Sequence, residues 1–235
     1  MRLVIVLILI LMIASSASAH LREGVILLHG LARTSASMEK MEAALIEDGY
    51  LVANINYPSR TAEISRLAED TISAALQNET LRDCPRIHFV THSLGGILVR
   101  SYFSKHTEPR LGRVVMLSPP NHGSEVVDNL KSWTLFQKLN GPSGSELGTD
   151  PDSTPNQLGA VDFELGVIAG DRFINWINSL MIPGKDDGKV SVEHTKVEGI
   201  TDHIVIHATH PYLMKNPRAI RQTLAFLRTG QFVHE

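Results

Sequence analysis

Short apolar runs alternate with longer amphipathic segments along this chain, and the alternation restricts its fold more than any other feature. The first run, from Gly24 to His29, is unbroken, which is typical of a β-strand covered on both faces. Residues 37–48 and 64–81 instead repeat their apolar side chains at helical spacing. Strands that alternate with helices predict a mostly parallel sheet with helices on both faces, which is an α/β fold.

The same alternation continues to the end of the chain and predicts about six strands. We expect strands at 24–29, 51–57, 86–91, 113–117, 163–169 and 204–208. We expect helices at 37–48, 64–81, 96–106 and from Asn216 to about Gly230, where an N-cap residue precedes Pro217.

Residues 121–160 interrupt the alternation, because no strand is expected there. A short amphipathic helix is expected at 132–139, and the sequences of 141–144 and 150–155 are typical of loops. An insertion of this length is usually a lid, a binding loop or a disordered stretch. We favour a cap over the functional site, with disorder as the alternative.

The N-terminal segment has the composition of a secretory signal peptide. A cationic start at Met1–Arg2 is followed by an apolar run over 3–13 and by the small residues 17–19, Ala-Ser-Ala. The run is shorter than the ~20 residues of a membrane span. We expect a signal peptide at 1–19, a single domain at 20–235 and export to the periplasm or the medium. An uncleaved membrane anchor is the alternative.

Charge and cysteine content exclude several classes of function. The chain has 22 Lys and Arg against 25 Asp and Glu, and no basic stripe or tail, so no nucleic-acid partner is expected. Cys84 is the only cysteine, which excludes an internal disulfide. We interpret it as a buried small side chain without a catalytic role.

Residues 91–95, Thr-His-Ser-Leu-Gly, lie between an expected strand and an expected helix. A serine at the apex of a sharp turn from strand to helix is typical of a nucleophile elbow, in which small neighbours such as Gly95 relieve crowding. Serine needs a neighbouring base to act as a nucleophile. Ser93 is therefore the candidate nucleophile, and the chain should supply a base, an acid and an oxyanion hole.

Three histidines near the last expected strand are candidates for the base. His210 lies in the loop between that strand and the final helix, at the carboxyl edge where chemistry gathers in open parallel sheets. We therefore favour His210, with His207 as the alternative. His203 and His207 are interpreted as ordinary histidines of the sheet.

The acid is expected between Ser93 and His210, where it would fix the imidazole tautomer. Asp187 lies on a turn before the last strand and ranks first, followed by Asp171 and then Asp186. The oxyanion hole requires two backbone N–H groups, expected from Leu94 and from Leu31, in the loop after the first strand.

These segments together resemble the α/β-hydrolase superfamily, and within it the compact bacterial lipases and esterases. The resemblance is carried by His-Gly-Leu at 29–31, His-Ser-Leu-Gly-Gly at 92–96, Pro-Asn-His-Gly-Ser at 120–124, Asp-Asp-Gly-Lys-Val at 186–190, and His210 with the helix that follows. The match at 186–190 favours Asp187 as the acid. Thr91 departs from the pattern, because the family usually has glycine there.

The resemblance implies a serine carboxylic-ester hydrolase that acts on a small or lipid ester through Ser93, His210 and Asp187. Trp133 and Phe136 would contact an acyl chain, and contact with a lipid surface is compatible with such a substrate. No cofactor is expected. Some lipases bind calcium near the histidine loop, but Pro211 and Tyr212 stand where an acidic residue is expected, so no metal is expected either.

Two alternative functions remain open at the level of the sequence. The same triad could serve an acyltransferase or a thioester or amide hydrolase, because any acyl transfer uses these groups. A non-catalytic exported binding protein is the least favoured alternative. The oligomeric state and the acyl-chain length are not predicted.

Overall fold

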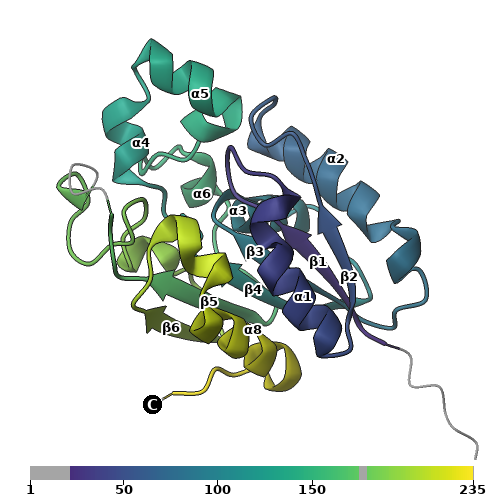
Figure 1. Cartoon of the computed structure of the whole chain (residues 1–235). Helices are drawn as coiled ribbons and strands as arrows, with labels where there is room; N and C mark the ends of the chain where they lie inside the picture. The colour runs from purple at the N-terminus through teal and green to yellow at the C-terminus, as the bar shows by residue number, and fades with distance from the viewer. Residues whose placement is uncertain (1–21, 175–178, 235) are drawn as a thin grey trace, which may run out of the picture.

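A computed structural model describes residues 22–174 and 179–234, so the expected signal peptide lies outside the described residues. These residues form a six-stranded sheet with the order β2-β1-β3-β4-β5-β6, and every adjacent pair is parallel (Figure 1). The strands are β1 Gly24–Leu28, β2 Leu51–Ile55, β3 Ile87–His92, β4 Leu111–Leu117, β5 Leu165–Gly170 and β6 Asp202–Ile206. The α/β architecture and the six strands are confirmed.

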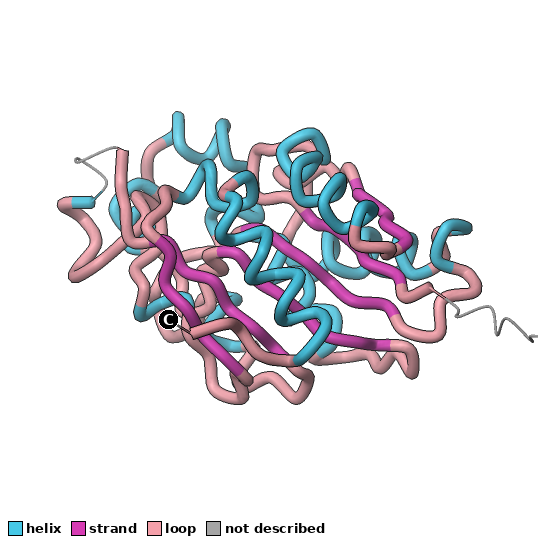
Figure 2. Tube along the Cα trace, turned by 60° about the horizontal axis from the view of Figure 1, so that its bottom comes forward, coloured by secondary structure: helices cyan, strands magenta, loops and turns pink. Residues whose placement is uncertain are grey.

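Helices cover both faces of the sheet, as the unbroken apolar strands require (Figures 1 and 2). On one face, α1 Glu39–Glu47 and α8 Pro217–Thr229 pack against a cluster that includes Val25 and Leu27. On the other face, α2 Ile64–Leu76 and α3 Leu94–Phe103 pack against a cluster that includes Ile26 and Leu28. Alternate residues of β1 therefore enter two cores, which explains why its sequence does not alternate with polar residues.

Some predicted boundaries are wrong by a few residues. The helix predicted to reach 81 ends at Leu76, because Asn78 starts a separate 3-10 turn at Glu79–Leu81 and its side chain accepts a 2.9 Å hydrogen bond from the Thr80 N–H. The last strand was predicted two residues too late. Its pairing runs from Gly166 with Asp202 to Gly170 with Ile206, so Ala208 already belongs to the following loop.

The insertion at 121–160 contains no strand, as predicted, but it is more helical than predicted. It forms α4 Glu125–Leu130, α5 Thr134–Ser145 and α6 Thr154–Gln157. Gly141 has a φ of 66° and divides α5 by a kink, where a Cβ atom would collide with the Arg60 carbonyl. The loops predicted at 141–144 and at 154–155 are therefore wrong, since helix resumes after Gly141 and α6 begins at Thr154.

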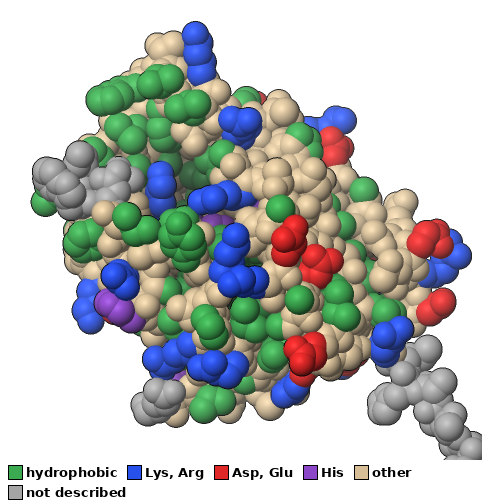
Figure 3. All heavy atoms as spheres, in the orientation of Figure 1, with side chains coloured by type: hydrophobic (Ala, Val, Ile, Leu, Met, Phe, Trp, Pro, Cys, Tyr) green, Lys and Arg blue, Asp and Glu red, His purple; other side chains and the backbone are tan. Residues whose placement is uncertain are grey.

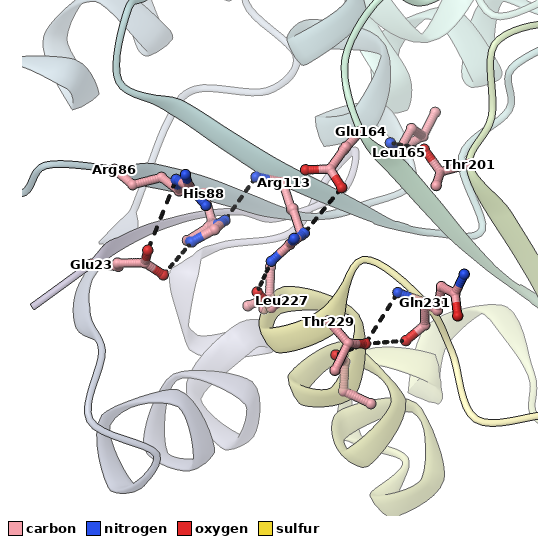
Figure 4. Close-up of polar contacts among 11 residues, drawn as sticks. Glu23, Arg86, His88, Arg113, Glu164, Leu165, Thr201, Leu227, Thr229 and Gln231 are labelled. Atoms are coloured by element: carbon pink, nitrogen blue, oxygen red, sulfur yellow. Dashed lines mark hydrogen bonds and ion pairs between the residues drawn. The ribbon is translucent and has the colours of Figure 1, made fainter.

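A polar network at the amino ends of the central strands lies at the sheet edge opposite to the carboxyl ends (Figure 4). His88 is fully buried, donates to Glu23 at 2.9 Å and accepts a 2.8 Å hydrogen bond from the Arg113 N–H. The Arg113 guanidinium also donates to the Leu227 carbonyl of α8 at 2.9 Å. The network satisfies both nitrogens of a buried imidazole and ties three adjacent strands to the last helix.

Two further observations concern the cysteine and the apolar length of the helices. Cys84 is buried and free, as predicted. Among residues 22–174 and 179–234, no helix is long and apolar enough to span a bilayer.

Candidate active site

Ser93 occupies a sharp turn between the end of β3 and the start of α3. Its φ of 53° and ψ of −119° lie outside the usual regions for a residue with a side chain. The Ser93 N–H donates to the Leu117 carbonyl at 2.9 Å, which fixes the turn to β4. Gly95 lets the helix approach β1, because a Cβ atom there would lie 2.8 Å from the Leu28 carbonyl oxygen. The strained serine, the glycine and the strand–turn–helix context together form a nucleophile elbow.

His210 joins Ser93 to Asp187 by two hydrogen bonds. His210 Nδ1 donates to Asp187 Oδ2 at 2.7 Å, and His210 Nε2 lies 3.0 Å from Ser93 Oγ. With the Nδ1 proton directed at the carboxylate, Nε2 keeps its lone pair and can accept the serine proton. All three residues are buried, and Ser93 and His210 each retain 9% exposure.

The backbone around Asp187 holds its carboxylate in place. Oδ1 accepts hydrogen bonds from the N–H groups of Lys189 at 3.0 Å and Val190 at 2.9 Å. The His210 N–H also donates to the Asp187 carbonyl at 3.0 Å. Both the side chain and the backbone of Asp187 are thus tied to the histidine loop, so the acid and the base keep a fixed relative position.

The other candidate residues form separate pairs. Asp171 accepts a 2.9 Å hydrogen bond from His207 Nδ1, and the His207 side chain is 73% exposed. Asp186 accepts from Ser179 Oγ and the Gly188 N–H, and His203 contacts Thr195 Oγ1. None of these residues contacts Ser93 among the described residues. The structure therefore brings together the three residues that the sequence analysis ranked first.

The expected oxyanion donors flank Ser93. Leu94 is the first residue of α3, so its N–H has no partner within the helix. Leu31 follows β1 and lines the cavity beside Ser93. Gly30 permits this close approach, because a Cβ atom there would lie 2.7 Å from His92 Nδ1 and 3.2 Å from Ser93 Cβ.

His92 is a neighbour of the site to which the sequence analysis gave no role. It is 2% exposed, donates from Nε2 to the His210 carbonyl at 3.0 Å and lies with its ring 4.7 Å from that of His210. Burial holds the pKa of His92 well below 6.5, so its imidazole is neutral. The sequence could have indicated that His92 lies beside the site, since it immediately precedes the candidate nucleophile.

His29 supports the other side of the site and was also missed. Its ring stacks on Tyr57 at 4.1 Å, and the Tyr57 hydroxyl donates to the His29 carbonyl at 2.6 Å. The Tyr57 N–H also donates to His29 Nε2 at 3.3 Å. Burial lowers the pKa of this imidazole and raises that of the Tyr57 hydroxyl. The two rings brace the loop that carries Gly30 and Leu31.

A cavity of about 140 Å³ opens beside Ser93 and His210. Its apolar wall comes mainly from α4, α5 and the segments around them, and it consists of Leu31, Pro120, Val126, Val127, Phe136, Leu147 and Val190. Phe136 therefore lies where the sequence analysis expected it. Trp133 does not line the cavity and is 61% exposed, so its contact with an acyl chain stays a prediction.

The described residues contain no cluster of three or more His, Cys, Asp or Glu side chains arranged to hold a metal ion.

The parallel sheet and the serine elbow define the α/β-hydrolase fold. Solved structures support this assignment at the level of the fold. The mature form of Bacillus licheniformis lipase BlEst2 has a TM-score of 0.72 and 18% sequence identity, with 91% of this chain and 94% of that chain covered. The resemblance of the sequence to the α/β-hydrolase superfamily is therefore confirmed at the level of the fold.

More distant structures give the same result. Phospholipase PlaB from Legionella pneumophila has a TM-score of 0.60 and 21% identity, with 74% of this chain and 45% of that chain covered. An extracellular α/β-hydrolase from a Paenibacillus species has a TM-score of 0.54 and 12% identity, covering 87% and 98%. No protein-family model and no curated protein matches the sequence. At these identities the likeness defines the fold alone.

Proposed function

We propose that the protein is a serine hydrolase of carboxylic esters that works through an acyl-enzyme intermediate. The observation that carries this proposal is the continuous hydrogen-bond relay from Ser93 Oγ to His210 Nε2 at 3.0 Å and from His210 Nδ1 to Asp187 Oδ2 at 2.7 Å. This relay is the arrangement that activates a serine for attack on an acyl carbon.

In the proposed reaction, Ser93 Oγ attacks the ester carbonyl while His210 Nε2 takes its proton. The negative charge that develops on the carbonyl oxygen is stabilised by the N–H groups of Leu31 and Leu94. His210 then protonates the leaving alcohol, and Asp187 stabilises the imidazolium formed in between. In the second half of the reaction, His210 takes a proton from water while the water oxygen attacks the acyl carbon. His210 then returns the proton to Ser93 Oγ, and the carboxylic acid is released.

The cavity supports an ester with an apolar acyl part. Val126 and Val127 of α4 and Phe136 of α5 line it beside the nucleophile, and such a surface favours an aliphatic chain over a charged one. Leu135 and Leu139 of α5 and the preceding Trp133 are exposed apolar side chains in the same insertion. Figure 3 shows hydrophobic side chains gathered over this part of the molecule. Several structural relatives are described as lipases or phospholipases, which agrees with the proposal.

A series of p-nitrophenyl esters of increasing acyl length tests the proposal on residues 20–235. We expect Ser93-dependent turnover, with the preferred length set by the apolar wall. Ser93→Ala is the control for non-specific hydrolysis of these activated esters, and turnover equal in both proteins contradicts the proposal. Product analysis with added alcohols and amines separates hydrolysis from acyl transfer.

We also propose that the protein acts after export, on the basis of the composition of residues 1–19. Mass spectrometry of the protein recovered from the producing cells tests this. The expected N-terminus is His20, whereas a mass that retains Met1 contradicts cleavage.

A further inference from the structure

Two cationic side chains line the cavity that contains Ser93. Arg33 follows the oxyanion loop, and Lys189 follows the proposed acid, so they reach the cavity from two different segments. Figure 3 shows lysine and arginine side chains grouped around a histidine near the middle of the face that it presents. The cavity is therefore lined by two cationic side chains, although the whole chain has a formal net charge of −3.

Neither cation is neutralised by a close partner. The Arg33 guanidinium and the Lys189 ammonium make no hydrogen bond or ion pair with another described residue. Some cations elsewhere on the surface do pair with acids, as in Arg66 with Asp70 at 2.6 Å and Arg110 with Glu108 at 2.9 Å. What distinguishes Arg33 and Lys189 is that both of them line the cavity that contains Ser93.

Asp187, the carboxylate that acts on Lys189, already accepts hydrogen bonds from other groups. Asp187 accepts hydrogen bonds from His210 Nδ1 and from the N–H groups of Lys189 and Val190. Although Lys189 as a whole residue is exposed, burial of its ammonium group lowers its pKa. Asp187 opposes this shift, and Arg33 adds to it with a smaller effect than that of Asp187. Arg33 also lowers the pKa of His92. The two cations therefore act on the same small volume, where an anion would relieve their mutual repulsion.

The two cations and the apolar wall come from different parts of the chain. Val126, Val127 and Phe136 belong to the insertion, whereas Arg33 and Lys189 belong to loops at the carboxyl edge of the sheet. An acyl chain on the apolar wall leaves the alcohol part of the ester for the cationic side. We propose that Arg33 and Lys189 recognise an anionic group, such as a phosphate, on the alcohol part of the ester substrate. This inference rests on the proposed ester hydrolysis at Ser93.

A matched pair of esters tests this inference. The two compounds are 1-octanoyl-glycerol 3-phosphate and 1-octanoyl-glycerol, which share the scissile ester and differ in the phosphate, both used as monomers. We expect kcat/KM for the phosphate compound to exceed that for the neutral one by about tenfold or more, because charge-assisted hydrogen bonds contribute more than neutral ones. An ionic strength of about 1 M, with a Debye length of about 3 Å, should reduce this ratio.

The variants Arg33→Gln and Lys189→Gln should each lower the ratio of the two kcat/KM values, and the double variant should bring it close to one. Lys105→Gln is the matched control, because Lys105 is an exposed cation just after the far end of α3 and does not line the cavity. It should leave the ratio as in the unmodified protein. Inorganic phosphate should inhibit p-nitrophenyl ester turnover competitively, more strongly than chloride at equal ionic strength.

Several outcomes would overturn the inference. Equal kcat/KM values for the two acylglycerols, or a preference for the neutral one, contradict it while leaving the ester hydrolase intact. Turnover of p-nitrophenyl esters without turnover of either acylglycerol contradicts it in the same way. If anionic vesicles accelerate the neutral ester and monomers show no preference, the cations serve a lipid surface instead. Absence of all Ser93-dependent turnover contradicts the proposed function itself.

Discussion

His210 donates its Nδ1 proton to Asp187 at 2.7 Å, while the rival pair His207 and Asp171 forms its own 2.9 Å hydrogen bond. Four of the six residues that were candidates for the base and the acid thus separate into two His–Asp pairs. The first pair is buried and touches Ser93, whereas the His207 side chain is 73% exposed. The two pairs offer a test of the proposed acid within one protein.

Asp187→Asn should reduce kcat for a p-nitrophenyl ester by about 10³- to 10⁴-fold, because an amide favours the wrong imidazole tautomer. Asp171→Asn should leave kcat within about twofold, since a surface pair contributes little even to stability. Steady-state kinetics on both variants checks this. A comparable loss in the two variants would exclude Asp187 as the specific partner of the base.

Gly30→Ala should lower kcat while the protein remains folded. Its Cβ atom would lie 2.7 Å from His92 Nδ1, which displaces the loop that carries the Leu31 N–H. Loss of one oxyanion donor costs about 10²- to 10³-fold in kcat. Gly112→Ala is the matched control, because its Cβ atom would lie 2.6 Å from His88 Nδ1, at the opposite edge of the sheet. Equal effects of the two substitutions on kcat, measured on folded protein, would argue against an oxyanion role for this loop.

Thr91→Val should stabilise the protein without loss of activity. Thr91 is fully buried, and its hydroxyl has no hydrogen-bond partner among the described residues. Removal of this unpaired group at nearly constant shape should raise the free energy of unfolding by about 1 kcal/mol in urea denaturation. Thr223→Val is the control, because the buried Thr223 hydroxyl donates to the Ala219 carbonyl at 2.9 Å. A larger stabilisation by the control substitution would contradict this interpretation of Thr91.

Acidification should destabilise the fold below pH 6.5, before the carboxylates protonate. Burial lowers the pKa of four histidines below 6.5 in the folded protein, namely His29, His88, His92 and His203. Because the unfolded chain then binds more protons than the folded one, the free energy of unfolding falls as the pH falls through this window. Each histidine contributes a slope of at most about 1.4 kcal/mol per pH unit.

His88→Gln isolates one of these contributions at a position remote from Ser93. The slope of unfolding free energy between pH 6.5 and 5.5, from urea titrations, should decrease in the variant. His194 opposes the trend, because the Glu125 carboxylate, 3.2 Å from its Nδ1, raises its pKa above 6.5. Its contribution is therefore present at low pH and lost as the pH rises through the folded value. His194→Gln should therefore steepen the same slope. An unchanged slope in both variants would contradict the account.

The central fold and the three residues of the relay were accessible from the sequence because they depend on local signals. Apolar strands such as β1 indicate burial on both faces, and at the elbow β3, Ser93 and α3 follow one another directly in the sequence. The order of Ser93, Asp187 and His210 then follows from the carboxyl ends of successive parallel strands.

Features that depend on tertiary contacts were less accessible. The kink at Gly141 reflects its close approach to the Arg60 carbonyl, far away in sequence, so the local signal at 141–144 was read as a loop. Trp133 and Phe136 are three residues apart, but only Phe136 faces the cavity. The cationic pair of Arg33 and Lys189 has no sequence signal, because it arises only when two loops meet at the site.

Covalent labelling of the nucleophile tests the central claim most directly. The unmodified protein and the variants Ser93→Ala and Asp171→Asn would be treated with a fluorophosphonate and analysed by peptide mass mapping. We expect one phosphonate per chain, located on Ser93, in the unmodified protein and in Asp171→Asn, and none in Ser93→Ala. Labelling of Ser93→Ala to the same extent as the unmodified protein, or modification at another residue in all three proteins, would contradict the assignment of Ser93 as the nucleophile.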